Sequence, residues 1–338
     1  MTNDGRSVLL MVSSTTRKLD FYDPTTGEHL GEITDLLPEP HEMAADRGRG
    51  LVYVTHTYRS GVYGDFTERS HEISVVDVAT RTVVDVIDIS PYQAPHDVEY
   101  NAARDRIYVG IEATEGGPQG IVVVDPQTRT VVDHIATQAP NCHWLVSSPD
   151  GSRAYATHKE APFMTIVDLE NNSVLATVEL PGGAEEINIA PDGSALFAAT
   201  PMIDRSRTGQ PFESKLVKLD PSDGSVLGEV ILPADICGVW ATSRGDVLVS
   251  QLSVPGAEDF LHGVLWVVDG KTMEIRGSVD TGRGVFTLRA SDDGALGYVA
   301  NAGDGTVSVV DMTTLAVVRV LDNSPSAQWG GTHGLAVC

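Results

Sequence analysis

Four histidines of this 338-residue chain occur at the same point of a recurring pattern, at the start of a short apolar segment. They are His41 in PEPHEMAAD, His96 in QAPHDVEY, His143 in APNCHWLVSS and His333 in GGTHGLAVC. Imidazole nitrogen is a ligand for zinc, iron, copper and nickel, and a carboxylate can complete such a site. The spacing therefore raises the possibility that these side chains meet at one ion.

A longer repeat places the histidines in a fold. Seven segments read as strand, polar turn and strand, each with an aspartate after an apolar run, and most are preceded by a second such unit with a turn like PDG. Four strands per repeat and a period of 42 to 54 residues predict an all-β, seven-bladed β-propeller with four antiparallel strands per blade. The aspartates are Asp23, Asp77, Asp125, Asp168, Asp220, Asp269 and Asp311.

The two ends of the chain fit into one blade. RSVLLMVSS near the start is typical of a second strand, and THGLAVC at the end is typical of a first strand. We therefore expect the last blade to be closed by the N- and C-terminal strands, which removes the open edge of the ring. On this interpretation residues 1–338 form a single propeller domain.

Short motifs at the ends of second strands resemble a known repeat. YVTH (53–56), YATH (155–158) and YVAN (298–301) look like the YVTN-type seven-bladed β-propeller repeat family. The resemblance extends over nearly the whole chain and implies the same fold. It does not specify a function, because this scaffold serves enzymes, binding proteins and surface proteins alike. His56 and His158 stand where the family typically has asparagine.

Counting back twelve residues from the second strands gives one position in each blade. Since first strands line the channel of a propeller, these positions form a ring around its axis. The ring reads His333, His41, His96, His143, Glu185, Cys237 or Gly238, and Phe286. We predict one divalent transition metal, zinc or iron, bound by His41, His96, His143, His333 and Glu185. The acids that follow ring positions, Glu42, Asp97 and Glu186, support ligand imidazoles or pair with backbone and cations between blades.

Long loops are expected at the mouth of this ring, within residues 55–72, 200–215 and 251–263. His158, His56 and Tyr58 lie at or near the ends of second strands on the same side. We predict that they transfer protons, because histidine and tyrosine can donate or accept a proton when their surroundings tune their pKa.

Composition excludes several classes of function. The net charge of −24 disfavours nucleic-acid binding, and no apolar run reaches the roughly 18 residues of a membrane span. The N-terminus lacks the basic segment of a signal peptide, and Cys142, Cys237 and Cys338 show no disulfide-framework spacing, so we expect a cytoplasmic protein with reduced thiols. Serine-hydrolase and nucleotide-binding motifs are absent.

Three functions remain open from the sequence. The first is a metal-dependent enzyme acting on a small organic molecule at the central channel, with lyase or hydrolase chemistry favoured over an oxygenase. The second is a non-catalytic binding or scaffold propeller. The third is a metal-free enzyme that uses histidine and glutamate as acid and base.

Overall fold

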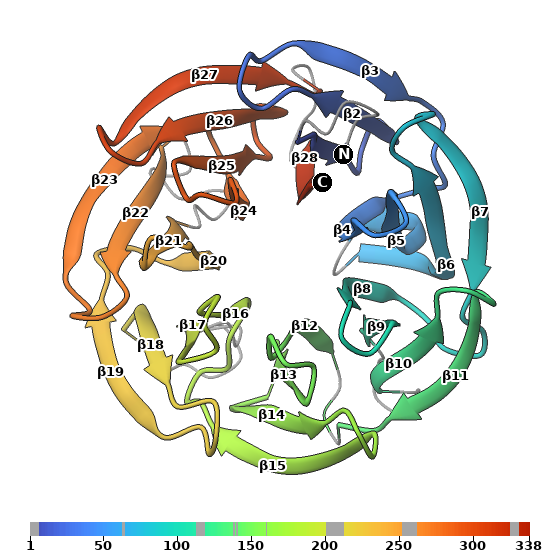
Figure 1. Ribbon diagram of the computed structural model, residues 1–338, viewed down its shortest axis with the longest axis horizontal. Helices are drawn as coiled ribbons and strands as arrows, with labels where there is room; N and C mark the ends of the chain where they lie inside the picture. Colours follow the sequence, from blue (N-terminus) through green and yellow to red (C-terminus); the bar gives the residue numbers. More distant parts are fainter. Residues whose placement is uncertain are drawn as a thin grey trace.

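The computed structural model describes residues 7–62, 65–112, 119–137, 139, 141–159, 161–200, 213–251, 262–324 and 331–338. Within them, the strands form seven four-stranded antiparallel sheets arranged in a ring (Figure 1). The predicted all-β, seven-bladed propeller is thus confirmed.

The strand bounds follow the repeat. Blade 1 holds β4 (Pro40–Asp46), β5 (Leu51–Val62), β6 (Asp65–Asp77) and β7 (Thr82–Asp88), and blade 2 holds β8 (Pro95–Asn101), β9 (Arg106–Ile111), β10 (Gly120–Asp125) and β11 (Thr130–Ile135). Blade 3 holds β12 (Cys142–Ser147), β13 (Arg153–His158), β14 (Phe163–Asp168) and β15 (Ser173–Glu179), and blade 4 holds β16 (Ile187–Ile189), β17 (Leu196–Thr200), β18 (Lys215–Leu219) and β19 (Val226–Ile231). Blade 5 holds β20 (Ile236–Ala241), β21 (Asp246–Gln251), β22 (Gly263–Asp269) and β23 (Ile275–Thr281), and blade 6 holds β24 (Val285–Ala290), β25 (Leu296–Asn301), β26 (Thr306–Asp311) and β27 (Ala316–Asp322). Blade 7 holds β28 (Thr332–Val337), β1 (Leu9–Ser13), β2 (Lys18–Tyr22) and β3 (His29–Ile33).

Blade 7 closes the ring as predicted. Its order is β28-β1-β2-β3, with Leu9 paired to Val337 and Met11 to Leu335. The innermost strand of this blade therefore comes from the end of the chain and the other three from its beginning, so both edges of β1 are hydrogen-bonded.

The core lies between blades. Inner strands carry apolar side chains on both faces, and the buried residues form seven clusters, each shared by two neighbouring blades. Tyr53 and Val98, for example, belong to one cluster although they lie in blades 1 and 2. In the fourth strands, by contrast, exposed and half-buried side chains can alternate, as they do along β15. Because every blade is held on both sides, the first strands are fixed rigidly around the axis.

The repeating aspartates hold the turns between third and fourth strands. Asp125 Oδ1 accepts hydrogen bonds from the backbone N–H groups of Gln127 at 2.8 Å and Thr128 at 3.0 Å. Asp269 does the same for Lys271 and Thr272. This side-chain cap on a tight turn explains why an aspartate recurs there.

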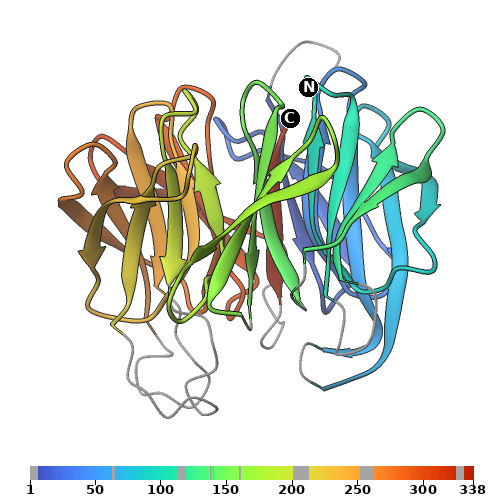
Figure 2. The same cartoon turned by 90° about the horizontal axis from the view of Figure 1, so that it is seen from below.

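One face of the ring carries an extension. β5 and β6 form a long hairpin that reaches beyond the blades on the side where the first strands begin (Figure 2). The prediction of a long loop in blade 1 at this mouth agrees with that position. The loops expected within 200–215 and 251–263 lie mostly outside the described residues.

Two further sequence predictions have structural counterparts. Cys142, Cys237 and Cys338 are all free and buried. None of the described segments forms a helix long and apolar enough to cross a membrane.

Candidate metal centre

The predicted ring positions are structurally equivalent. In each blade the residue two positions after the ring position pairs directly with a residue of the second strand. Met43 pairs with Val54 in blade 1, and Leu288 pairs with Val299 in blade 6. In blade 5 this register is Val239 with Val249, which assigns the ring position to Cys237 and not to Gly238. In six blades the register shifts beside the ring position, and such a β-bulge re-aims a side chain.

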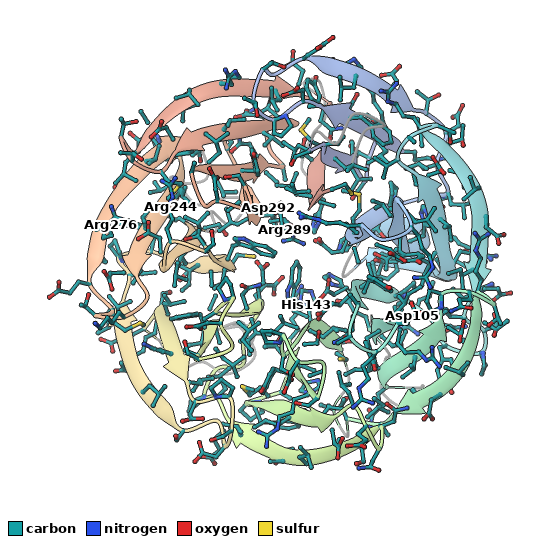
Figure 3. All side chains as sticks on the ribbon, in the orientation of Figure 1. Asp105, His143, Arg244, Arg276, Arg289 and Asp292 are labelled. Carbon is teal, nitrogen blue, oxygen red and sulfur yellow. The ribbon has the colours of Figure 1, made fainter. Side chains whose placement is uncertain are left out.

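The four histidines form one continuous row. The ring centroids of His333 and His41 are 4.0 Å apart, those of His41 and His96 4.4 Å, and those of His96 and His143 3.7 Å. Phe286 continues the row on the other side, 5.2 Å from His333. His143 is labelled in Figure 3, where its side chain points into the centre of the ring.

Backbone carbonyls of the next blade set the tautomers of two of these imidazoles. His96 Nδ1 lies 3.0 Å from the carbonyl oxygen of His143, and His143 Nδ1 lies 3.4 Å from that of Glu185. A carbonyl oxygen only accepts, so Nδ1 carries the proton in both residues. Each Nε2 is then left with a lone pair directed inward, which is the arrangement that supports a metal-ligating histidine.

The nitrogen atoms converge. His41 Nε2 lies 2.9 Å from His96 Nε2, and His41 Nδ1 finds no hydrogen-bond partner among the described residues. The donor atoms form two sets, and the atoms within each set lie within 4.8 Å of one another. One set comes from His41, Glu42 and His333, and the other comes from His96, Glu112 and His143. The 2.9 Å contact joins these two sets. The structure thus brings the four predicted histidines together as two adjoining groups.

Carboxylates and one lysine surround the row. Glu185 Oε1 is 3.5 Å from His143 Nε2 and 3.5 Å from the ammonium of Lys159, which itself lies 3.1 Å from His143 Nε2. Glu42 Oε1 is 2.9 Å from His333 Nδ1. The Oε2 atoms of Glu185 and Glu42 are buried without a hydrogen bond from the described residues. Buried oxygens of this kind are costly unless something binds them.

Burial keeps three of the ring imidazoles neutral. It lowers the pKa of His41, His96 and His143 well below the usual value, and neighbouring imidazoles and Lys159 lower it further. Burial also raises the pKa of Glu185, although Lys159 opposes this. Neutral imidazole is the form that ligates a metal.

The three acids that follow ring positions divide between the two roles considered for them. Glu42 lies beside a ring imidazole, as described above. Asp97 Oδ2 instead accepts a hydrogen bond from the backbone N–H of Leu145 at 2.9 Å, and Glu186 Oε2 accepts one from Val239 at 2.8 Å. Asp97 and Glu186 therefore tie neighbouring blades together.

His56 and His158 do not join the row. Each bonds a hydroxyl on the third strand of its own blade, His56 Nε2 to Ser74 at 2.8 Å and His158 Nε2 to Thr165 at 2.7 Å. Asn301 makes the same contact in blade 6, to Ser308 at 2.9 Å. These histidines thus occupy the position of the repeat asparagine and perform its cross-strand contact.

Tyr58 is connected to the row through one residue. Its hydroxyl donates to Glu112 Oε2 at 2.7 Å, and Glu112 Oε1 lies 3.5 Å from His143 Nε2. Tyr58 is buried, so the chain from the phenol to the imidazole is shielded from bulk water.

Sequence reasoning gave no role to Glu112, Lys159 or Glu39. Glu112 and Lys159 occupy equivalent places, since their backbone N–H groups bond the carbonyl two residues before the ring position, in Ala94 and Asn141. Both residues directly follow the second strand of their blade, so comparing that position across the seven repeats would have identified them. Glu39 lies two residues before His41, with 3.8 Å between its Oε1 and His41 Nδ1, and burial raises its pKa to about 8.

Comparisons with known proteins agree with the architecture. No protein-family model matches the chain. It is 24% identical over 307 residues to the "Uncharacterized protein YncE" of Salmonella typhi and equally to that of Salmonella typhimurium, covering 87% of this chain and 79% of each relative. A solved structure titled "Kuenenia stuttgartiensis Hydrazine Synthase" superposes with a TM-score of 0.72 and 17% identity over 92% of this chain and 94% of that one. The chain is a seven-bladed β-propeller whose axis carries histidine and glutamate groups that can hold a metal ion.

Proposed function

We propose that the ring binds one divalent transition metal and that the protein is an enzyme acting on a small organic molecule there, by lyase or hydrolase chemistry. The observation that carries this is that the four ring histidines, with Glu42 and Glu112, bring their donor atoms together in two adjoining groups. Such groups have the spacing of metal ligands, and an ion there would give the buried oxygens of Glu185 and Glu42 a partner.

The surroundings of the row suit catalysis on a bound molecule. A metal here would polarise a carbonyl or lower the pKa of a bound water. Lys159, the Glu112–Tyr58 pair and Glu39 provide groups beside the row that can hold or move a proton. Phe286 and Cys237 supply an apolar arc, against which the carbon skeleton of a substrate would pack.

A metal-free acid–base enzyme is the second candidate. It is favoured by the contact of 3.1 Å between Lys159 Nζ and His143 Nε2, because an ammonium placed there neutralises Glu185 and can donate a proton without any ion. Under this alternative, the catalytic pair is Lys159 and His143.

Elemental analysis of untagged, metal-reconstituted protein separates these candidates. We expect about one equivalent of a transition metal in the wild type and loss of most of it in His96→Ala. His29→Ala is the control, because His29 lies outside the ring in a group with the buried Asp20 and the exposed Glu32 that also has metal-ligand spacing. Equal metal in wild type and His96→Ala, or none after anaerobic loading with Fe²⁺, Zn²⁺, Mn²⁺ or Ni²⁺, would overturn the metal site and favour the Lys159–His143 pair.

The same proposal includes membership of the YVTN-type repeat family, organisation as one domain and a cytoplasmic location. The family is supported by the motifs at 53–56, 155–158 and 298–301, which lie in the second strands of blades 1, 3 and 6. The location is supported by three cysteines that remain free thiols.

A further inference from the structure

The central channel has a second chamber, at the end opposite the histidine row. A pocket of about 250 Å³ lies among residues one to six positions beyond the ring positions, and all seven blades contribute to it. Arg289, Trp240 and Trp144 line it. Arg289 points toward the axis in Figure 3, with Asp292 at the same mouth.

The cation in this pocket has few protein partners. Only 8% of Arg289 is exposed, and its one hydrogen bond within the described chain goes from Nη1 to the carbonyl of Leu288 at 2.8 Å. Its Nη1 also forms an ion pair with the buried carboxylate of Glu186, at 3.8 Å from Oε1, which is beyond hydrogen-bond distance. Four of the five N–H groups of the guanidinium are therefore without a described acceptor.

Aromatic rings fix the orientation of this guanidinium. Its carbon lies 4.6 Å from the ring centre of Trp240 and 5.8 Å from that of Trp144. Such stacking holds the plane of the group and removes much of the entropy cost of ordering a long side chain. A planar guanidinium held in place presents a pair of parallel donors, the arrangement that matches a carboxylate.

The acids at the same end are largely engaged elsewhere. Asp292 receives two hydrogen bonds from Arg47, at 2.7 and 2.8 Å, across the mouth of the pocket. Both oxygens of Asp97 accept backbone N–H groups, and Glu99 Oε1 accepts the hydroxyl of Ser147. Burial also raises the pKa of Glu99 to about 7, which weakens its repulsion of an anion.

We propose that this chamber is a binding site for a small organic carboxylate with a flat or apolar body, whose carboxylate pairs with Arg289 and whose body lies against the indole rings. The site lies beyond the histidine row along the same channel, with the Trp144 ring centre 6.4 Å from that of His96, and it needs no metal. It follows that the propeller has a ligand site at each end of one channel.

The test uses metal-free full-length protein and three probes of the same shape: benzoate, benzamide and benzylamine. Binding is followed by calorimetry and by tryptophan fluorescence, since two indoles line the pocket. We expect benzoate to bind about tenfold or more tightly than benzamide, and Arg289→Gln to weaken benzoate by about tenfold or more. Arg276→Gln is the matched control. Arg276 lies on the outer strand β23, away from the pocket, and pairs with Asp246.

Several results would overturn the proposal. They are equal binding of benzoate and benzamide, tighter binding of benzylamine, absence of binding by any probe, and benzoate binding that survives Arg289→Gln but is lost in His96→Ala. The last result would place the anion at the histidine row. If Arg289→Gln does not fold, the comparison of the three probes on wild type decides alone, and Arg289→Lys tests the planar fork.

Discussion

Replacing His158 with asparagine separates a structural role from a catalytic one. His158 is buried, and burial lowers its pKa to about 4. Asn301 already occupies the equivalent place in blade 6 and bonds the equivalent hydroxyl. The substitution therefore installs the side chain that the repeat uses elsewhere and removes one titrating group.

The magnitude follows from proton linkage. The unfolded chain takes up a proton at this histidine below about pH 6.5, whereas the folded chain does so only near pH 4. Stability therefore falls as the pH drops from 6.5 toward 4, and at pH 5 the loss from this one residue is about 2 kcal/mol. His158→Asn should lose that part of the acid sensitivity, at a cost of about 1–2 kcal/mol at pH 8 from poorer packing.

Urea unfolding at pH 8 and pH 5 measures both quantities. The difference in unfolding free energy between the two pH values should be about 2 kcal/mol smaller in His158→Asn than in wild type. An identical pH dependence in wild type and His158→Asn would refute the reasoning, because the buried imidazole would then titrate as it does in the unfolded chain.

Three further outcomes are expected. Glu42→Gln should weaken metal binding by about 10- to 100-fold in a chelator competition, because this carboxylate supports a ring imidazole; unchanged affinity would contradict that role. Tyr58→Phe should lower the unfolding free energy in urea by about 1–3 kcal/mol through loss of the 2.7 Å bond to Glu112, and a neutral effect would mean that the bond adds nothing. Gly334→Ala should destabilise by about 1–3 kcal/mol and lower metal content, since a Cβ there would lie 2.2 Å from the His41 carbonyl oxygen; wild-type melting would refute this.

The positions of the ring residues could be predicted because a repeat in β-strands has a fixed count. Twelve residues separate the first-strand and second-strand positions in the blades whose turns have equal length. The count is ambiguous in blade 5, where one residue is missing, and only strand pairing there assigns Cys237. The seven blades and the closing blade followed from the same regularity.

Side-chain partners could not be read from that count. Histidine in place of the repeat asparagine at 56 and 158 suggested proton transfer, yet both side chains reach a hydroxyl on the third strand. That contact depends on the residue of the third strand that lies two positions after the one opposite position 56 or 158. The tautomers of His96 and His143 likewise depend on backbone carbonyls of the following blade, which no local pattern specifies.

The closing blade determines when the histidine row can be completed during biosynthesis. His41 and strand β1 are synthesised early. His333 belongs to β28, which pairs with β1 and is synthesised near the end of the chain. At about 5–20 residues per second, the 292 residues from Glu42 to His333 take about 15 to 60 s to synthesise. During that time β1 has an unpaired edge and the row lacks its last imidazole. The row therefore cannot be complete before β28 has been made and has paired with β1.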